Sequence, residues 1–263
     1  MHMLIFGLGY TTSRLAARLR GQGWRVTATR RQADGDVLAF DDIRVPAAIA
    51  SATHIVSSVP PADDADPVLT RYGAVLAAAP AHWVGYLSST GVYGDAGGAW
   101  VDEATPLGTG RRSARVAADL GWQALRDDVR VFRLPGIYGP GRSAINRVRG
   151  GTAQRIDAPW HRFSRIHVDD IVGCVEASFE RGGPGIFNVA DTEPAPNAAV
   201  IEYACDLLGV AYPPLERLDA ARMSPMVRGF YAESRQVAAG RIIRDLGVRL
   251  AYPDYRAGLR ACR

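Results

Sequence analysis

The sequence contains no lysine, because all 31 basic side chains are arginine. This excludes every site that needs a lysine amine: a Walker-type phosphate loop, a Schiff base and a Tyr-x-x-x-Lys catalytic pair. The 27 acidic residues are interspersed with the arginines, and the net charge is only +4. We therefore expect no positively charged stripe for nucleic acid.

Cysteine is also scarce, and long apolar runs are missing. Cys174, Cys205 and Cys262 are far apart and form no C-x-x-C pair, so we expect reduced thiols. The five histidines show no metal-ligand spacing, and we expect no metal site. No apolar run approaches the roughly 18 residues that cross a bilayer. The N-terminus lacks the features of a signal peptide, so a cytoplasmic protein without membrane association is expected.

A glycine-containing turn near the N-terminus is the strongest local pattern. Gly7 and Gly9 directly follow the apolar run Met3–Phe6, and apolar residues at helical spacing come next. A strand, a glycine turn and a helix in this order bind a dinucleotide diphosphate on the backbone N–H groups that open the helix. The third glycine position of the motif is Thr12, a small residue. The alternative is a glycine turn before an ordinary surface helix.

The tip of the next predicted strand, 24–29, indicates which dinucleotide is bound. An acidic residue there would hydrogen-bond the ribose 2′-hydroxyl of NAD, whereas arginine accommodates the 2′-phosphate of NADP. This chain has Arg30 and Arg31 at the tip and no acid before Asp34. The pattern predicts NADP, with NAD as the open alternative. A solvated loop that happens to carry two arginines is the structural alternative.

Strands and helices alternate through the first half, which predicts a doubly wound parallel α/β sheet. We expect a dinucleotide-binding domain over 1–192 and a small, mainly helical lobe over 193–263, with 141–165 contributing to the lobe. Segment 146–163 shows little periodicity and is interpreted as a loop. Further predicted strands are 37–40, 54–59, 83–87, 129–134 and 185–190, and predicted helices are 66–79, 113–127, 171–180, 198–208 and 235–246.

Four later motifs agree with this architecture: LSSTGVYG at 87–94, RLPGIYGPG at 133–141, RIHVDD at 165–170 and FNVAD at 187–191. With the glycine turn, they make the chain resemble the extended short-chain dehydrogenase/reductase superfamily, specifically the NAD-dependent epimerase/dehydratase type. The resemblance implies a Rossmann-type sheet with a small C-terminal substrate lobe. It also implies cofactor contacts at Gly7, Gly9, Tyr10, Thr11, Thr12, Asp41, Ser58, Val59, Ser88, Pro135, Gly136 and Ile137.

The predicted active site departs from the pattern of that family. The serine before the V-Y-G motif is Ser89, which the resemblance assigns to polarising the substrate oxygen. The family's catalytic tyrosine and lysine positions are occupied by Arg111 and Arg115, and arginine does not release a proton near neutral pH. Arg115 is left with the lysine's other role, a hydrogen bond to the nicotinamide ribose. An exposed helix arginine is the alternative.

Proton transfer would then require Tyr93, Tyr138 or water, although tyrosines in such motifs more often serve packing. For His167, which precedes an acidic pair, we expect a structural hydrogen bond, and we expect Asp169 or Asp170 to cap the helix that follows. Residues expected to meet the substrate are Thr90, Arg111, Arg142 and Arg165.

The sequence therefore predicts an NADP-linked oxidoreductase or epimerase-like protein. Its substrate would be a small polar alcohol or ketone, sugar-linked or nucleotide-linked. A catalytically inactive dinucleotide sensor is the alternative, because fold alone does not decide activity. A third hypothesis is a site for an anionic ligand that is lined by Arg142, Arg147, Arg149 and Arg165. A homodimer is left open.

Overall fold

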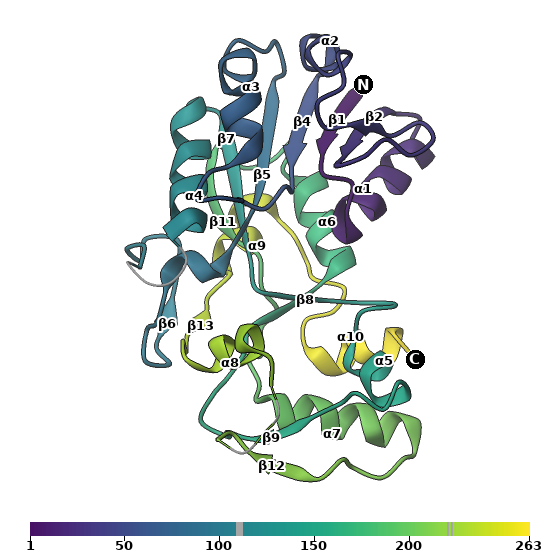
Figure 1. Cartoon of the computed structure of the whole chain (residues 1–263), viewed down its shortest axis with the longest axis vertical. Helices are drawn as coiled ribbons and strands as arrows, with labels where there is room; N and C mark the ends of the chain where they lie inside the picture. The colour runs from purple at the N-terminus through teal and green to yellow at the C-terminus, as the bar shows by residue number, and fades with distance from the viewer. Residues whose placement is uncertain (109–112, 220, 222) are drawn as a thin grey trace.

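A seven-stranded sheet forms the centre of the computed structural model, which describes residues 1–108, 113–219, 221 and 223–263 (Figure 1). All neighbouring strands in this sheet are parallel. The prediction of a Rossmann-type parallel sheet is confirmed. In spatial order the strands are β11 (Gly185–Asn188), β7 (Val129–Leu134), β5 (Trp83–Ser89), β4 (His54–Ser57), β1 (His2–Phe6), β2 (Arg25–Arg30) and β3 (Leu38–Ala39).

Alternate side chains of the central strand β1 supply two separate cores. Met3 and Ile5 point to one face of the sheet, and Leu4 and Phe6 point to the other. All four are fully buried. A parallel sheet covered on both faces needs continuous apolar strands of this kind. Strand β3 is shorter than the predicted 37–40 and pairs only with β2, because it lies at the sheet edge.

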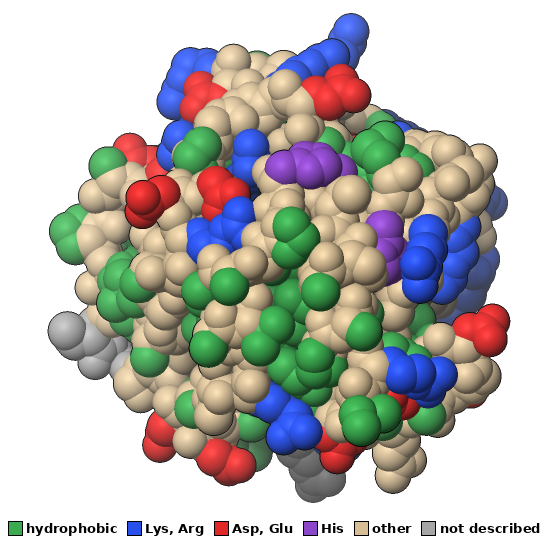
Figure 2. Space-filling model, turned by 90° about the horizontal axis from the view of Figure 1, so that it is seen from above, with side chains coloured by type: hydrophobic (Ala, Val, Ile, Leu, Met, Phe, Trp, Pro, Cys, Tyr) green, Lys and Arg blue, Asp and Glu red, His purple; other side chains and the backbone are tan. Residues whose placement is uncertain are grey.

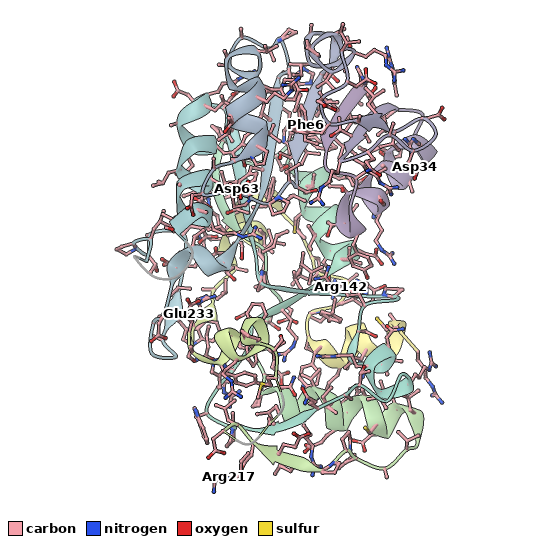
Figure 3. The ribbon with its side chains drawn as sticks, viewed as in Figure 1. Phe6, Asp34, Asp63, Arg142, Arg217 and Glu233 are labelled. Atoms are coloured by element: carbon pink, nitrogen blue, oxygen red, sulfur yellow. The ribbon has the colours of Figure 1, made fainter. Side chains whose placement is uncertain are left out.

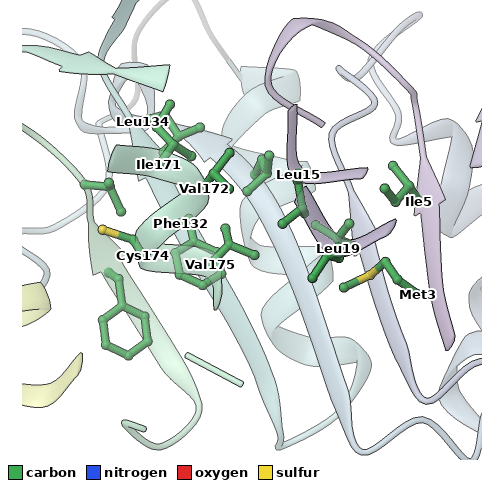
Figure 4. Close-up of a cluster of buried hydrophobic side chains, with 14 of the residues drawn as sticks. Met3, Ile5, Leu15, Leu19, Phe132, Leu134, Ile171, Val172, Cys174 and Val175 are labelled. Carbon is green, nitrogen blue, oxygen red and sulfur yellow. The ribbon is translucent and has the colours of Figure 1, made fainter. Parts of the chain in front are cut away.

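Three helices cover the first face: α1 (Tyr10–Gly21), α6 (Val168–Ala177) and α9 (Gly240–Leu246). Leu15 and Leu19 of α1 meet the apolar side of α6 over this face (Figure 4). The other face carries α2 (Val45–Ser51), α3 (Pro67–Ala77) and α4 (Ser113–Leu125). Of these three helices, α2 was not predicted from the sequence.

The strand order places a crossover point beside β1. The chain runs from β1 to β2 and β3 on one side, and then returns to β4, β5, β7 and β11 on the other. In open α/β sheets, ligands bind at the carboxyl ends of the strands beside such a crossover point.

A lobe lies beyond the carboxyl ends of the strands (Figure 1). The prediction that 146–163 is a loop was wrong in part, because the chain forms helix α5 (Ala144–Arg149) and strand β9 (Arg155–Asp157) there. The predicted helix 235–246 begins only at Gly240, after a short strand, and its buried Ile242 and Leu246 pack into the sheet core rather than the lobe. Elements outside the central sheet layers are η1 (Thr90–Tyr93), β6 (Trp100–Val101), β8 (Gly136–Tyr138), α5 (Ala144–Arg149), β9 (Arg155–Asp157), β10 (Arg165–His167), α7 (Asn197–Leu208), β12 (Leu215–Arg217), α8 (Pro225–Tyr231), β13 (Gln236–Val237) and α10 (Tyr255–Ala261).

The start of α6 corrects another prediction. The helix begins at Val168, and its N-cap is His167, whose ring Nδ1 accepts from the backbone N–H of Asp169 at 3.3 Å. Neither Asp169 nor Asp170 caps it. The buried Asp170 carboxylate instead accepts from the backbone N–H groups of Ala251 and Tyr252, which holds the C-terminal segment against α6.

All three cysteines are free, as expected. Within the described ranges, no cluster of His, Cys, Asp and Glu side chains is arranged to hold a metal ion. None of the described helices is both long enough and apolar enough to span a bilayer. Charged side chains of both signs are interspersed on the end of the molecule where α2 and α3 lie (Figure 2).

Candidate functional site

The loop between β1 and α1 has the backbone geometry of a tight diphosphate-binding turn. Gly7 has φ +82°, a conformation that side chains rarely adopt. A Cβ there would lie 3.0 Å from Val59 Cγ2 and 3.1 Å from Ser58 Oγ. Glycine is therefore required because the loop after β4 packs directly against Gly7. The Ser58 hydroxyl donates to the Gly7 carbonyl at 2.6 Å and holds the two loops together.

Thr12 occupies the third glycine position of the motif and closes the turn. It is fully buried, and its hydroxyl donates to the Gly7 carbonyl at 2.7 Å and accepts from the Gly9 N–H at 2.9 Å. The missing glycine is thus replaced by a side chain that fixes the loop from within. The sequence showed only that this position was small.

Gly9 leaves open the space in front of α1. A Cβ at Gly9 would meet no atom within 4 Å, unlike one at Gly7. The helix has no side-chain cap at Gly9 and no acidic residue in its first turn. Its first N–H groups and the positive end of its dipole are therefore available to an anion. Tyr10 and the buried Thr11 lie in this first turn, as predicted.

Arg30 lies beside this loop at the tip of β2. Its Nε donates to the Leu8 carbonyl at 3.1 Å, and its Nη1 pairs with Asp34 at 2.8 Å. Arg31 is exposed next to it, and the predicted cofactor contact Asp41 is also exposed, just after β3. An open cavity of about 550 Å³ beside the loop is lined by Leu8, Gly9, Tyr10, Ser13, Arg14, Ala17 and Arg30.

Tyr10 joins this loop to the segment that follows β8. Its hydroxyl donates to the Pro140 carbonyl at 2.9 Å. The guanidinium groups of Arg14 and Arg142 lie 5.5 Å and 5.6 Å from its ring centroid. Arg142, which we expected to meet the substrate, thus lies close to the first turn of α1 (Figure 3). Arg14, which no sequence pattern singled out, lines the cavity and pairs with Asp169 at 2.9 Å.

A buried polar network lies beneath the end of β5, and the sequence analysis missed it. Arg133 donates to both oxygens of Asp119, at 2.7 and 3.1 Å, and both residues are almost fully buried. Ser88 donates to Asp119 at 2.5 Å, which makes this hydroxyl part of the network rather than a free cofactor ligand. The network joins β5, α4 and β7, so it fixes the strand end that carries Ser89.

The hydroxyl groups of the two candidate catalytic tyrosines both form internal hydrogen bonds. The Tyr93 hydroxyl donates to Asn188 at 2.7 Å and accepts from Arg133 at 3.1 Å. Burial raises its pKa, although the charge of Arg133 opposes this. The Tyr138 hydroxyl donates to the Asp254 carbonyl at 3.3 Å, and burial raises its pKa strongly. Neither phenol is placed to act as an acid or base near neutral pH.

Ser89 is the predicted catalytic hydroxyl that remains accessible. It ends β5, is half-buried, and its oxygen accepts from the Gly91 N–H at 3.1 Å. Accepting this bond leaves its own proton free to donate. Thr90 beside it is buried, and Arg115 lies half-buried in the first turn of α4. The predicted substrate residue Arg111 lies outside the described residues.

The turn after β7 supplies the remaining predicted contacts. Gly136 pairs with Arg165 of β10, and Ile137 pairs with the next residue of that strand. Pro135 and Ile137 are half-buried and Gly136 is exposed, so the turn is accessible at the carboxyl end of the sheet. Arg165 lies on the lobe side of this turn, where its Nη1 donates to the carbonyls of Phe163 and Ala195.

These residues fit a pyridine dinucleotide. The open space in front of Gly9 and the uncapped helix start suit a diphosphate. Ser89 ends β5 and Pro135 directly follows β7, so both lie at the carboxyl ends of the same sheet.

No protein-family model matches the chain. The protein YeeZ of Escherichia coli K12 is 28% identical over 284 aligned residues, which cover 95% of this chain and 96% of YeeZ. A 3-diazoavenalumate denitrifying reductase from Streptomyces is 33% identical over 142 residues, or 49% of this chain and 45% of the reductase.

Solved structures agree with the fold. A functionally unknown conserved protein from Silicibacter pomeroyi is 43% identical, with a TM-score of 0.92 and 99% and 97% of the two chains covered. A protein from Methylobacillus flagellatus assigned to the NAD-dependent epimerase/dehydratases is 26% identical, with a TM-score of 0.70 and the same coverage. The human epimerase family protein SDR39U1, solved with NADPH, is 19% identical, with a TM-score of 0.78 and 99% and 98% covered. The chain therefore belongs to the same family as the Silicibacter pomeroyi protein, and its structural neighbours are members of the NAD-dependent epimerase/dehydratase family.

Proposed function

We propose that this protein binds NADP(H) at the carboxyl ends of the strands, over the loop between β1 and α1, and that it is an oxidoreductase for a small polar alcohol or ketone. The carrying observation is the loop from Gly7 to Thr12, which is closed by the buried Thr12 hydroxyl but open in front of Gly9. Two neighbours support this proposal, since one is solved with NADPH and another relative is a reductase.

The preference for NADP over NAD follows from the tip of β2. Arg30 is anchored to the Leu8 carbonyl through Nε, so its guanidinium is held beside the glycine loop. Its partner Asp34 is largely exposed, and exposed pairs contribute little. A 2′-phosphate can therefore compete for Arg30, with Arg31 as a second donor.

The nicotinamide supplies hydride transfer when it is bound, and this chain must then orient the substrate and handle a proton. Ser89 would donate its hydroxyl proton in a hydrogen bond to the substrate oxygen, because the Ser89 oxygen is fixed by Gly91. Arg115 would hold the nicotinamide ribose. Since Tyr93 and Tyr138 are occupied by internal hydrogen bonds, the proton itself would come from water.

A catalytically inactive dinucleotide sensor is the second candidate. Two observations favour it: the chain has no lysine, and the two candidate tyrosines, Tyr93 and Tyr138, are buried. The two candidates share the cofactor site and differ only in turnover.

A panel of aldehydes, ketones and alcohols distinguishes the two. We expect NADPH oxidation or NADP⁺ reduction with at least one compound class. The absorbance of the reduced nicotinamide measures either reaction. A protein that binds NADPH but turns over none of the panel would support the sensor and contradict the enzyme.

A further inference from the structure

Two arginines from different elements line the open cavity of about 550 Å³ beside the glycine loop. Arg14 comes from the second turn of α1, and Arg30 comes from the tip of β2. The other residues that line the cavity are Leu8, Gly9, Tyr10, Ser13 and Ala17. No carboxylate is therefore among the described lining residues. A cavity of this size accepts a small ligand, and two guanidinium groups in its wall favour an anion.

The wall that α1 contributes is hollowed beside Arg14. Tyr10, Ser13, Arg14 and Ala17 have the i, i+3, i+4, i+7 spacing of a single helix face. Ser13 and Ala17 are small, so they leave room next to the longer arginine side chain. Ala17 is exposed, which places this face at the surface of the molecule. A ligand can therefore approach Arg14 from solvent.

Both guanidinium groups are held close to the glycine loop. Arg30 donates through Nε to the Leu8 carbonyl at 3.1 Å. The Arg14 guanidinium lies 5.5 Å from the ring centroid of Tyr10, within the range of a cation–π contact. Because Tyr10 is in the first turn of α1, the Arg14 side chain points back toward the start of the helix. The two arginines thus reach the same loop, one from α1 and the other from β2.

Each arginine has an acidic neighbour that does not line the cavity. Arg14 Nη1 lies 2.9 Å from Asp169 Oδ1 of α6, and Arg30 Nη1 lies 2.8 Å from Asp34 Oδ2. The side chains of Arg14 and Asp169 are 32% and 39% exposed, and ion pairs this accessible contribute little to stability. Each pair engages Nη1, and a guanidinium has further N–H donors. A phosphate monoester, which carries nearly two negative charges, can therefore compete for both arginines.

We propose that Arg14 binds the 2′-phosphate of NADP(H) together with Arg30, and that Asp169 competes with this phosphate for Arg14. The inference rests on the proposed function, since it adds a specificity-determining residue to the same cofactor site. The diphosphate would bind the N–H groups in front of Gly9. The ribose 2′ position is expected at the tip of β2, where Arg30 lies and where Arg14 borders the same cavity.

The contribution of Arg14 should depend on Arg30. Residues that bind one shared group are coupled energetically, and Asp169 retains Arg14 when no phosphate is held beside it. Arg14→Gln should therefore lower the preference for NADPH in the wild type. It should change nothing in a protein that already carries Arg30→Ala and Arg31→Ala.

The test measures the dissociation constants of NADPH and NADH by calorimetry at constant ionic strength, and its readout is their ratio. Arg14→Gln should reduce the preference for NADPH about fivefold, because it loses one charge-assisted hydrogen bond and only a weak ion pair is lost in exchange. NADH affinity should change little. The matched control is Arg18→Gln, one turn further along α1. It removes the same charge from a side chain that pairs with Glu176 at 2.7 Å and does not line the cavity, so the ratio should stay that of the wild type.

Asp169→Asn tests the competition for Arg14. It should raise the preference for NADPH several-fold in the wild type and leave the preference unchanged in Arg14→Gln. A loss of negative charge that acted only through space would raise the preference in both backgrounds. Arg14 and Asp169 are both partly exposed, so these variants should fold, and thermal unfolding checks that they do.

Three results would overturn the inference and leave the dinucleotide site standing. These are an unchanged ratio in Arg14→Gln, an equal fall in Arg18→Gln, or the same effect of Asp169→Asn with and without Arg14. Absence of heat with either dinucleotide, in a sample that unfolds cooperatively, would instead contradict the proposed function and the inference together.

Discussion

Gly9→Val should weaken dinucleotide binding strongly and leave the protein folded. A side chain at Gly9 meets no protein atom within 4 Å, and φ of −103° is acceptable for any residue. The only structural cost is a poorer helix N-cap, about 1 kcal/mol or less. The isopropyl group would instead fill the space in front of α1. Losing two charge-assisted hydrogen bonds from backbone N–H groups, at about 1.5 kcal/mol each, weakens NADPH binding about a hundredfold.

Gly7→Ala is the informative contrast. Its positive φ costs an alanine about 1–2 kcal/mol, and the new methyl would lie 3.0 Å from Val59 Cγ2. Both loops would have to move, so the free energy of unfolding should fall by about 2–3 kcal/mol. Gly7→Ala should therefore lower stability, whereas Gly9→Val should lower only affinity.

Urea unfolding and NADPH calorimetry on both variants measure the two effects separately. Gly173→Ala is the control, because this glycine lies inside α6 with open space and an ordinary φ, so the substitution should stabilise by about 0.5–1 kcal/mol without changing binding. Retained NADPH affinity in a folded Gly9→Val variant would refute the assignment of the diphosphate to this loop.

Three further perturbations test other parts of the site and the fold. Ser89→Ala should lower turnover of any identified substrate about a hundredfold with little change in NADPH affinity, and an unchanged rate would remove Ser89 from the mechanism. Burial lowers the pKa of His54 in the folded protein to about 4. As pH falls, this histidine therefore becomes protonated in the unfolded chain before it does so in the folded protein, and the free energy of unfolding should decrease by about 3 kcal/mol between about pH 6.5 and pH 4. His54→Phe should lack this loss in urea titrations across that range, and identical pH profiles would contradict it. Arg133→Met should lower the free energy of unfolding by about 3–5 kcal/mol, because it leaves the buried Asp119 carboxylate without its partner charge. Adding Asp119→Asn should restore part of the lost stability. No recovery in the double variant would show that loss of the ion pair is not the cause.

The sheet could be predicted because its strands are buried on both faces. The run Met3–Phe6 is continuously apolar, and 129–134 is apolar except at Arg130 and Arg133. Glycine turns and amphipathic helices separate such runs. The edge strand β3 and the short helix α2 were less predictable. An edge strand is only partly buried, and a seven-residue helix gives too few turns for a clear period.

The polar interior of the site could not be predicted, because it joins residues far apart in the sequence. Asp119, Arg133 and Ser88 come from three elements, and each alone is typical of a solvated position. His167 caps α6 through its ring nitrogen, a role that the neighbouring acidic pair obscured. In the lobe, short strands such as β9 and β12 pair with each other rather than with the main sheet, so tertiary contacts define them more than local pattern.

Comparing NADPH with NADH by calorimetry tests the central claim most directly. The wild type should bind NADPH more tightly, by about tenfold or more for one charge-assisted contact to the 2′-phosphate, and Arg30→Ala with Arg31→Ala should abolish the difference. No heat with either dinucleotide, in a sample whose unfolding transition shows that it is native, would contradict the account.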